Sequence, residues 1–570
     1  MKRFGQPLTT TLPGRRRLLV VVAALAGLAL ILRAADLQLL KQEFLKHQAD
    51  ARHLRTVAIP AHRGVITDRA GDPLAISIPV DSVWADPSQA LQAPQRLARV
   101  AERLDLDPGK LQARLQARQA REFEYLRRHL DPDQADQVRQ IGAPGVYLRR
   151  EYKRFYPLGE VTGHVLGFTD IDDRGQEGIE LAFDNWLRGQ PGAKRILRDR
   201  KGNAIADIAR LRASEPGDKL TLTLDRRLQF LAYRELKAAV QAHQASSGSV
   251  VILEPRTGAV LAMANQPAFN PNDRRQIVSS HYRNRAVTDV LEPGSTLKPF
   301  TIAMALAADA YQPGDQIDTQ PGYYQVAGHT IQDHRNYGRL DLGMILTKSS
   351  NVGASQIALS LPAERLWSIL HRLGFGQASG LQFPGAVPGR LAHHSRWRRL
   401  EHATIAFGYG VAVTPLQLAR AYAVLANDGR LPEAHLVKRE TVSRQVMPAA
   451  TARTVRQMLE SVVGPEGTAS RAAVANYRVA GKTGTVHKAV AGGYAEDRYQ
   501  SLFVGMAPAS RPRLLTVVVI DEPKGQEYYG GLVAAPVFAR IMAEALRLTH
   551  VPPDNLPTRK AAHAAGGGAT

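Results

Sequence analysis

The hydrophobic residues begin with an uninterrupted apolar run from Leu18 to Leu32, which has basic residues on both sides. Its 15 residues fall short of the about 20 that span a bilayer, but the Arg33 side chain can extend to the membrane surface while the helix continues to Leu40. A cleaved signal peptide has a similar apolar core, and it stays open as an alternative. We expect an uncleaved anchor over residues 18–40, because no small-residue cleavage site free of charge follows the run.

Basic residues set the expected orientation of this segment. Three arginines, Arg15 to Arg17, precede the apolar run directly. Cytoplasmic flanks of membrane helices carry an excess of Lys and Arg. We therefore expect a cytoplasmic basic tail over residues 1–17, a single membrane pass, and everything after residue 40 outside the cytoplasm.

Short segments with turns follow the apolar run. Alternation with an Asp/Gly turn over residues 63–72 predicts β-hairpins, whereas residues 88–140 have helical spacing, with Pro108-Gly109 separating two helices. Residues 151–205 return to Gly and Asp turns. No nucleophile lies near a base in this part of the chain. We expect residues 41–217 to form a non-catalytic domain whose many charges lie on solvated faces.

A different order of elements begins after a boundary near Glu215-Pro216-Gly217-Asp218. Strand patterns occupy both ends of this part, and helical patterns occupy its middle, from about residue 340 to 465. This order is typical of an α+β domain in which helices pack on an antiparallel sheet and the middle forms a second, all-helical lobe. We assign residues 218–551 to this domain and expect a disordered tail over residues 552–570. The predicted elements are strands at Leu220–Leu224, Tyr477–Thr485, Ser501–Ala507 and Leu514–Ile520, a hairpin at Ser249–Asn265, and helices near 228–240 and 534–546.

Composition and charge narrow the classes of partner. The chain has 74 Lys and Arg against 52 Asp and Glu, a net charge of +22, which permits binding to nucleic acid, anionic lipid or another acidic polymer. No zinc spacing, Gly-rich phosphate loop or aromatic-interleaved basic stripe supports a nucleic-acid partner. A chain without cysteine has neither a disulfide framework nor a thiol nucleophile.

The first candidate for chemistry is Ser295 with Lys298, in the stretch Glu292-Pro293-Gly294-Ser295-Thr296-Leu297-Lys298-Pro299. We expect Ser295 to cap a helix whose first turn accommodates Pro299, so that the serine and the lysine lie about one turn apart on one face. Lys298 can serve as a base if burial or another cation lowers its pKa. Taken alone, the motif also fits an ordinary capped helix with a solvated lysine.

Two further polar motifs follow. Lys348-Ser349-Ser350-Asn351-Val352-Gly353 is typical of a turn or helix start, and taken alone it also fits a capped loop. Lys482-Thr483-Gly484-Thr485 ends an alternating segment, where glycine weakens a strand unless another backbone approaches closely. A peptide substrate that adds to an edge strand supplies such a reason.

Ser-x-x-Lys, Ser-x-Asn and Lys-Thr-Gly, in this order, are the signature set of penicillin-binding proteins and serine β-lactamases. Further stretches resemble those of the class B penicillin-binding proteins. Within that class, Glu292 and the motif at residues 348–353 resemble the same motifs of the division-specific (FtsI-type) transpeptidases. Ala406 departs from the serine that such relatives often have. The resemblance covers residues 15–550 and implies a single transmembrane helix, an elongated pedestal domain and a transpeptidase domain. The additional stretches are 63–69, 154–164, 177–180, 407–410, 414–417 and 529–531.

The resemblance also implies a role for each motif residue. Ser295 would attack the penultimate D-alanine carbonyl of a stem pentapeptide after Lys298 removes its proton, and Ser349 would relay a proton to the departing D-alanine. Lys482 would keep Lys298 deprotonated and attract the substrate carboxylate. No metal or cofactor is implied. The remaining residues are Asn351 for the substrate amide, Thr483, Gly484 and Thr485 for substrate binding, and the backbone N–H groups of Ser295 and Thr485 as an oxyanion hole.

The implied function is septal peptidoglycan D,D-transpeptidation that forms 4→3 cross-links and is the target of β-lactams. The implied location is the bacterial inner membrane at the division septum, with the catalytic domain in the periplasm. Partners would be stem peptides, β-lactams, a membrane glycan polymerase of the SEDS family and other division proteins, but not nucleic acid. Alternatives are a conditionally used paralogue, a β-lactamase, a β-lactam-sensing receptor and a non-catalytic division scaffold. The anchor and pedestal argue against the β-lactamase, and the intact motif residues argue against the scaffold.

Overall fold

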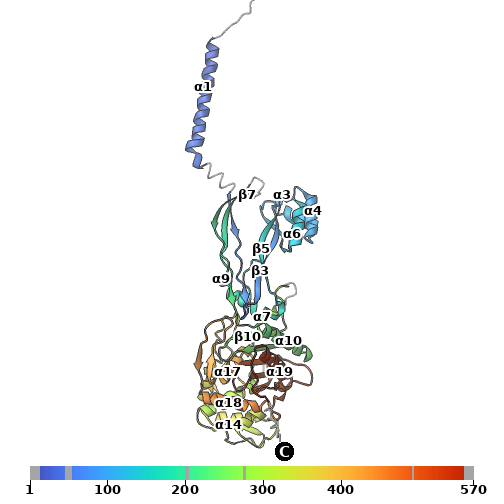
Figure 1. Cartoon of the computed structure of the whole chain (residues 1–570), viewed down its shortest axis with the longest axis vertical. Coiled ribbons are helices and arrows are strands. Elements are labelled where there is room, and N and C mark those ends of the chain that lie inside the picture. The colour runs from blue at the N-terminus through green and yellow to red at the C-terminus, as the bar shows by residue number, and fades with distance from the viewer. Residues whose placement is uncertain (1–12, 45–53, 199–203, 274–277, 491–492, 557–570) are drawn as a thin grey trace, which may run out of the picture. The chain divides into compact units, whose positions relative to one another are not determined.

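The structure is a computed structural model that describes residues 13–44, 54–198, 204–273, 278–490 and 493–556 (Figure 1). Most of the predicted disordered tail, and most of the predicted cytoplasmic tail, lie outside the described residues. Contacts divide the chain into two compact units. The first contains Met1–Ala61, Asp81–Arg149 and Gln190–Pro216, and the second contains His62–Val80, Arg150–Gly189 and Gly217–Thr570.

The first unit begins with the apolar helix α1 (Pro13–Ala35), which continues as the π-helical turn η1 (Asp36–Leu40). The helical segment Gly14–Leu40 is long and apolar enough to cross a membrane, and none of it is buried. The expected continuation to Leu40 is therefore confirmed. Arg33 Nη1 lies 2.7 Å from a carboxylate oxygen of Asp36, so the charge that follows the apolar run is paired on the helix itself.

The rest of the first unit holds a three-stranded antiparallel sheet in the order β1-β6-β7, and a helical cluster. The two predicted helices are α4 and α5, but the structure adds the strand β4 within the region expected to be helical. β6 and β7 were also missed, because charged residues interrupt their apolar alternation. The elements are β1 (Leu54–Ile59), α3 (Pro87–Ala90), α4 (Pro94–Arg103), α5 (Pro108–Gln116), β4 (Glu124–Leu130), α6 (Pro132–Ile141), β6 (Gly192–Arg198) and β7 (Ala204–Arg212).

The second unit begins with short elements around a buried ion network. Arg63 and Arg154 both bind the carboxylate of Glu180, with contacts of 2.7 and 2.6 Å, and Arg63 also contacts Asp184 at 2.8 Å. Arg63 and Glu180 are fully buried, so the expectation that charges in this region lie on solvated faces is wrong here. Buried charges are tolerated only when paired, as these are. The elements of this part are β2 (Ile66–Thr67), η2 (Gly159–Val161), α7 (Gly163–Leu166), α8 (Gly178–Ala182), α9 (Asp184–Leu187) and β8 (Leu220–Thr221). The strands β3 (Pro73–Ala85) and β5 (Val146–Phe155) each have residues in both units.

The centre of the second unit is a five-stranded antiparallel sheet in the order β10-β9-β19-β18-β17. The predicted hairpin and late strands are all present, and β17 is an edge strand, as expected. Helices α10 and α19 pack together on this sheet although they lie far apart in the sequence (green and dark red in Figure 1). The elements are α10 (Arg226–Ala242), β9 (Ser247–Leu253), β10 (Val260–Gln266), β17 (Ala480–Val490), β18 (Gly493–Ala507), β19 (Leu514–Asp521) and α19 (Gly530–Leu548).

Helices form most of the lobe between the two parts of the sheet, as the sequence predicts. The expectation of an all-helical lobe is wrong, because the described residues of this lobe also form the strand pairs β11-β14, β12-β13 and β15-β16. Helix α17 packs on β9 and β19, and α18 packs against α12, α13 and β17. Together these contacts place α12, α13 and β17 around one site. The elements are η3 (Ser279–His281), α11 (Arg285–Thr288), η4 (Gly294–Leu297), α12 (Lys298–Ala307), β11 (Ile317–Asp318), β12 (Tyr323–Val326), β13 (His329–Gln332), β14 (Arg339–Leu340), α13 (Leu342–Lys348), α14 (Asn351–Leu359), α15 (Ala363–Arg372), η5 (His394–Arg396), α16 (Arg399–Ile405), α17 (Pro415–Ala426), β15 (Arg430–Pro432), β16 (Ser443–Gln445), α18 (Ala449–Ser461) and η6 (Ser470–Ala472).

Candidate active site

Ser295 lies in the 3-10 turn η4, and α12 begins only at Lys298. The expectation that Ser295 caps a helix is therefore wrong, since Leu297 occupies the cap position of α12. The hydroxyl of Ser295 instead accepts a hydrogen bond from Lys298 Nζ at 3.0 Å. Pro299 lies in the first turn of α12, as expected, where its missing N–H removes no helical bond.

The turn that carries Ser295 is held between two other segments. Gly294 N donates to Gly408 O at 3.1 Å, and Gly294 has a φ of +53°. A Cβ on Gly294 would lie 2.4 Å from Val486 Cγ2 on β17. Both the left-handed backbone and the close approach explain why glycine precedes the serine. The position of Ser295 thus depends on β17 and on the loop at Gly408.

Lys298 is fully buried and makes four polar contacts. Besides Ser295 Oγ, its Nζ reaches Ser349 Oγ at 3.1 Å, Asn351 Oδ1 at 2.8 Å and the backbone oxygen of Ser349. Ser349 ends α13 in the left-handed conformation, with a φ of +60°, and this conformation precedes the start of α14. The first two sequence motifs therefore meet at the amine of Lys298.

Lys482 brings the third motif to the same point. Its Nζ donates to Ser349 Oγ at 3.0 Å, so one hydroxyl contacts the amines of both lysines. Lys482 is also fully buried. The sequence analysis requires a second cation near Lys298 if Lys298 is to act as a base. The structure places Lys482 in that position.

Burial and like charge lower the pKa values of both lysines. Burial is the larger cause for Lys298, the positive charge of Lys482 adds to it, and together they hold the pKa of Lys298 well below its usual range. Asp333 opposes this shift. Burial lowers the pKa of Lys482 to about 7. Burial and the positive charge of Lys482 therefore both favour the neutral form of the Lys298 amine beside Ser295.

Asp333 is a site residue that the sequence analysis missed. Its buried carboxylate accepts hydrogen bonds from Ser350 Oγ, Asn351 N and Val352 N, the last at 3.0 Å. It thus occupies the N-terminal end of α14, where a negative charge is stabilised. A lone aspartate in no motif gave no signal. Its role became visible only when the loop after β13 was placed beside the second motif.

The strand β17 presents Thr483, Gly484 and Thr485 near the Ser295 turn. Thr485 Oγ1 accepts a hydrogen bond from Gly530 N at 2.9 Å, and the hydroxyls of Thr483 and Thr468 lie 3.0 Å apart. A Cβ on Gly484 would lie 3.1 Å from the backbone oxygen of Pro293. Another backbone does approach this glycine, and it belongs to the residue before the Ser295 turn. The peptide substrate that the sequence analysis offers as the reason stays a prediction.

Glu292, three residues before Ser295, binds the loop that contains Gly410. Its Oε1 accepts hydrogen bonds from Gly410 N at 2.7 Å and from Tyr494 Oη at 3.1 Å. Beside Glu292 lies a cavity of about 530 Å³ that is also lined by Arg390, His487 and Lys488. This space adjoins the end of β17 and leaves room for a substrate that extends along the strand. Within the described residues, no group of three or more His, Asp or Glu side chains is arranged to hold a metal ion.

Comparison with known families settles the classification. The family described as Penicillin binding protein transpeptidase domain matches residues 248–543, and the family described as Penicillin-binding Protein dimerisation domain matches residues 58–222. This chain is a penicillin-binding protein. Its transpeptidase match contains all three motifs that meet at Ser349.

Relatives of this penicillin-binding protein match nearly its whole length. Peptidoglycan D,D-transpeptidase FtsI of Escherichia coli is 42% identical over 94% of this chain and 92% of the relative. A protein of Pseudomonas aeruginosa named Probable peptidoglycan D,D-transpeptidase PbpC is 42% identical over 95% of this chain and 96% of the relative. Among solved structures, the transpeptidase domain of penicillin-binding protein 3 from Burkholderia pseudomallei is 41% identical, with a TM-score of 0.55 over 59% of this chain and 98% of that one. A peptidoglycan synthetase from Bifidobacterium adolescentis is 25% identical, with a TM-score of 0.70 over 89% of this chain and 98% of that one.

Proposed function

We propose that this penicillin-binding protein is a serine-type peptidoglycan D,D-transpeptidase that cross-links stem peptides during cell division. The observation that carries the proposal is the shared contact of Lys298 and Lys482 with Ser349 Oγ, next to Ser295. Relatives of similar length at 41–42% identity are named FtsI and PenA peptidoglycan D,D-transpeptidases.

The acylation step begins when neutral Lys298 accepts the proton of Ser295 Oγ. The oxygen then attacks the carbonyl carbon of the penultimate D-alanine. We propose that the backbone N–H groups of Ser295 and Thr485 stabilise the negative oxygen that forms. As the C–N bond breaks, the proton passes from Lys298 through Ser349 Oγ to the amine of the departing D-alanine. The hydrogen bond between Lys298 Nζ and Ser349 Oγ supports this route.

Substrate binding is assigned to the outer edge of β17. We propose that the hydroxyls of Thr483 and Thr485, together with charged Lys482, bind the terminal carboxylate, and that Asn351 binds a substrate amide. Asn351 has a second task, because its Oδ1 also fixes Lys298. The amine of a neighbouring stem peptide then attacks the acyl-enzyme. The ester C–O bond breaks as the new amide forms, which completes a 4→3 cross-link and returns the proton to Ser295.

We further propose that residues 41–217 form the non-catalytic part and residues 218–551 the catalytic part. The N-terminal apolar helix and the FtsI relatives fit a membrane-anchored protein. On this basis we place the N-terminus in the cytoplasm and the catalytic part in the periplasm at the septum. A glycan polymerase of the SEDS family and other division proteins are the proposed partners. Depletion in growing cells tests the division role, with filaments that lack septa as the expected result. Normal division after depletion would favour a conditionally used paralogue.

Labelling with a fluorescent penicillin tests the chemistry. The full-length protein should label covalently, Ser295→Ala should not label, and the exposed serine control Ser279→Ala should label normally. Lys298→Ala should slow acylation by about 10²–10⁴-fold, as expected for loss of a general base. Equal labelling of wild type and Ser295→Ala would show that the nucleophile is elsewhere. Rapid release of the label would instead indicate a β-lactamase.

A further inference from the structure

A second polar cavity in the helical lobe shares no residue with the candidate active site. Its volume is about 380 Å³, and three arginines from separate elements line it together with one glutamate. Cavities of a few hundred Å³ are the size that small ligands occupy. The lining residues are His371, Arg372, Gln377, Ala378, Ser379, Gly380, Arg420, Glu433 and Arg444.

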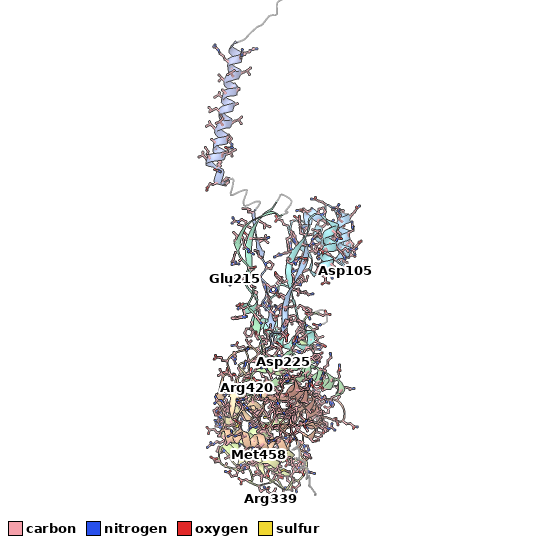
Figure 2. All side chains as sticks on the ribbon, viewed as in Figure 1. Asp105, Glu215, Asp225, Arg339, Arg420 and Met458 are labelled. Carbon is pink, nitrogen blue, oxygen red and sulfur yellow. The ribbon has the colours of Figure 1, made fainter. Side chains whose placement is uncertain are left out.

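Arg420, labelled in Figure 2, comes from α17 and is the least exposed of the three arginines. Its Nε donates to Pro432 O at 3.0 Å. Among the described residues, no carboxylate lies within ion-pair distance of its guanidinium. Burial, together with the positive charge of Arg444, lowers the pKa of Arg420, and the negative charge of Glu433 opposes this shift. Arg420 therefore feels one carboxylate at a distance but forms no ion pair with it.

The other charges of the cavity offset the charge of Arg420 only in part. Arg444 Nη2 donates to the backbone oxygen of Arg372 at 2.6 Å, which aligns one guanidinium at the end of α15. Glu433 is the one acidic residue of the lining, and it already pairs with Arg439 at 3.1 Å. The cavity thus has a net excess of positive charge. Partial shielding from water strengthens its attraction for an anion.

We propose that this cavity binds an oxyanion, a phosphate or carboxylate group carried by a polar molecule. Guanidinium groups suit this task because their N–H donors match the spacing of phosphate and carboxylate oxygens. Two sources share this chemistry, namely soluble phosphates and the free carboxylates of peptidoglycan peptides.

The experiment titrates the full-length protein with inorganic phosphate, with pyrophosphate and with a soluble muropeptide, by calorimetry. Arg420→Gln and Arg444→Gln should each weaken binding about tenfold, because each removes charge-assisted hydrogen bonds. Arg365→Gln is the matched control, since it removes an exposed arginine of α15 outside the cavity and changes the net charge equally. Penicillin labelling verifies that each variant is folded. If Arg420→Gln does not fold, Arg444→Gln and Arg372→Gln decide.

Removing the cavity's carboxylate should have the opposite effect on ligand binding from removing an arginine. Glu433→Gln should tighten binding, because it removes the one negative charge of the lining.

Binding of phosphate or pyrophosphate alone would assign the source to soluble phosphates, and binding of the muropeptide alone would assign it to wall peptides. The proposal is overturned if no probe binds at millimolar concentration, or if Arg365→Gln weakens binding as much as the cavity variants do.

Discussion

Lys298 and Lys482 both donate a hydrogen bond to Ser349 Oγ, at 3.1 and 3.0 Å. Both amines are fully buried, and no carboxylate forms an ion pair with either among the described residues. This arrangement makes protonation of the pair costly. It links the acid–base state of Lys298 to that of a lysine 184 positions later in the sequence.

The pH dependence of acylation should report this pair. Lys298 acts as a base only when neutral, so the rate should fall as the pH drops through its lowered pKa. Lys482 loses its proton above about pH 7, and attraction of the substrate carboxylate should then weaken. We expect a bell-shaped profile of kcat/KM for penicillin acylation. Lys348→Ala, which removes a neighbouring lysine paired with Glu466, should leave the profile unchanged. A flat profile would contradict the assignment of Lys298 as the base.

Asp333→Asn should shift the acid side of that profile to lower pH. The carboxylate of Asp333 favours the charged form of Lys298, and its removal lowers the pKa of that lysine further. The matched control is Asp341→Asn, because Asp341 also accepts a backbone N–H at a helix start, from Met344 at 2.7 Å. Asparagine caps a helix about as well as aspartate, so Asp341→Asn should change the unfolding free energy by no more than about 0.5 kcal/mol. A profile shift of equal size in both variants would show that the charge of Asp333 does not act on Lys298.

Glu180→Gln should destabilise the protein by about 3–5 kcal/mol, because it leaves Arg63 and Arg154 buried without their shared partner charge. Chemical denaturation of the full-length protein measures the change. Asp136→Asn breaks a pair with Arg139 in which both side chains are more than half exposed, and should cost no more than about 1 kcal/mol. Equal effects of the two substitutions would mean that the buried network contributes no more than a surface pair.

Gly294→Ala should slow acylation strongly. The new Cβ would meet Val486 and require a left-handed backbone, so the turn that holds Ser295 has to move. Gly328→Ala provides a control, since Gly328 also has a positive φ, of +81°, but no atom lies within 4 Å of its added Cβ. The control should cost about 1–2 kcal/mol of stability and keep normal acylation. Normal acylation by Gly294→Ala would show that this contact does not position the nucleophile.

Elements with strong apolar periodicity were predictable from the sequence. The hairpin β9–β10, the late strands and the α10 and α19 helices follow directly from alternation or helical spacing. Strands β4, β6 and β7 were not predictable, because charged residues such as Arg127 and Arg195 occupy positions that interrupt the apolar pattern. Strands β4 and β6 pair with β3 and β1, which are distant in the sequence, and a local pattern does not contain such partners. Strand β7 pairs with the neighbouring β6.

The candidate site likewise has residues that the sequence predicted and one that it did not. The motif residues Ser295, Ser349 and Lys482 were named from the sequence, and the structure brings them together. Their catalytic and substrate-binding roles stay predictions. Asp333 was not found, because a carboxylate that caps a helix from a separate loop leaves no spacing signal. The cap expected at Ser295 was wrong because the lysine contact competes for the hydroxyl and a 3-10 turn precedes the helix.

The glycine before Ser295 is held by Gly408 on one side and by Val486 on the other. Both contacts come from residues that the ribosome adds long after the serine. A chain that ends before β17 therefore contains Ser295 but no site around it. If Ser295 is the proposed nucleophile, we expect reactivity toward penicillin only in the finished fold, so that labelling of newly made chains reports the moment at which folding is complete.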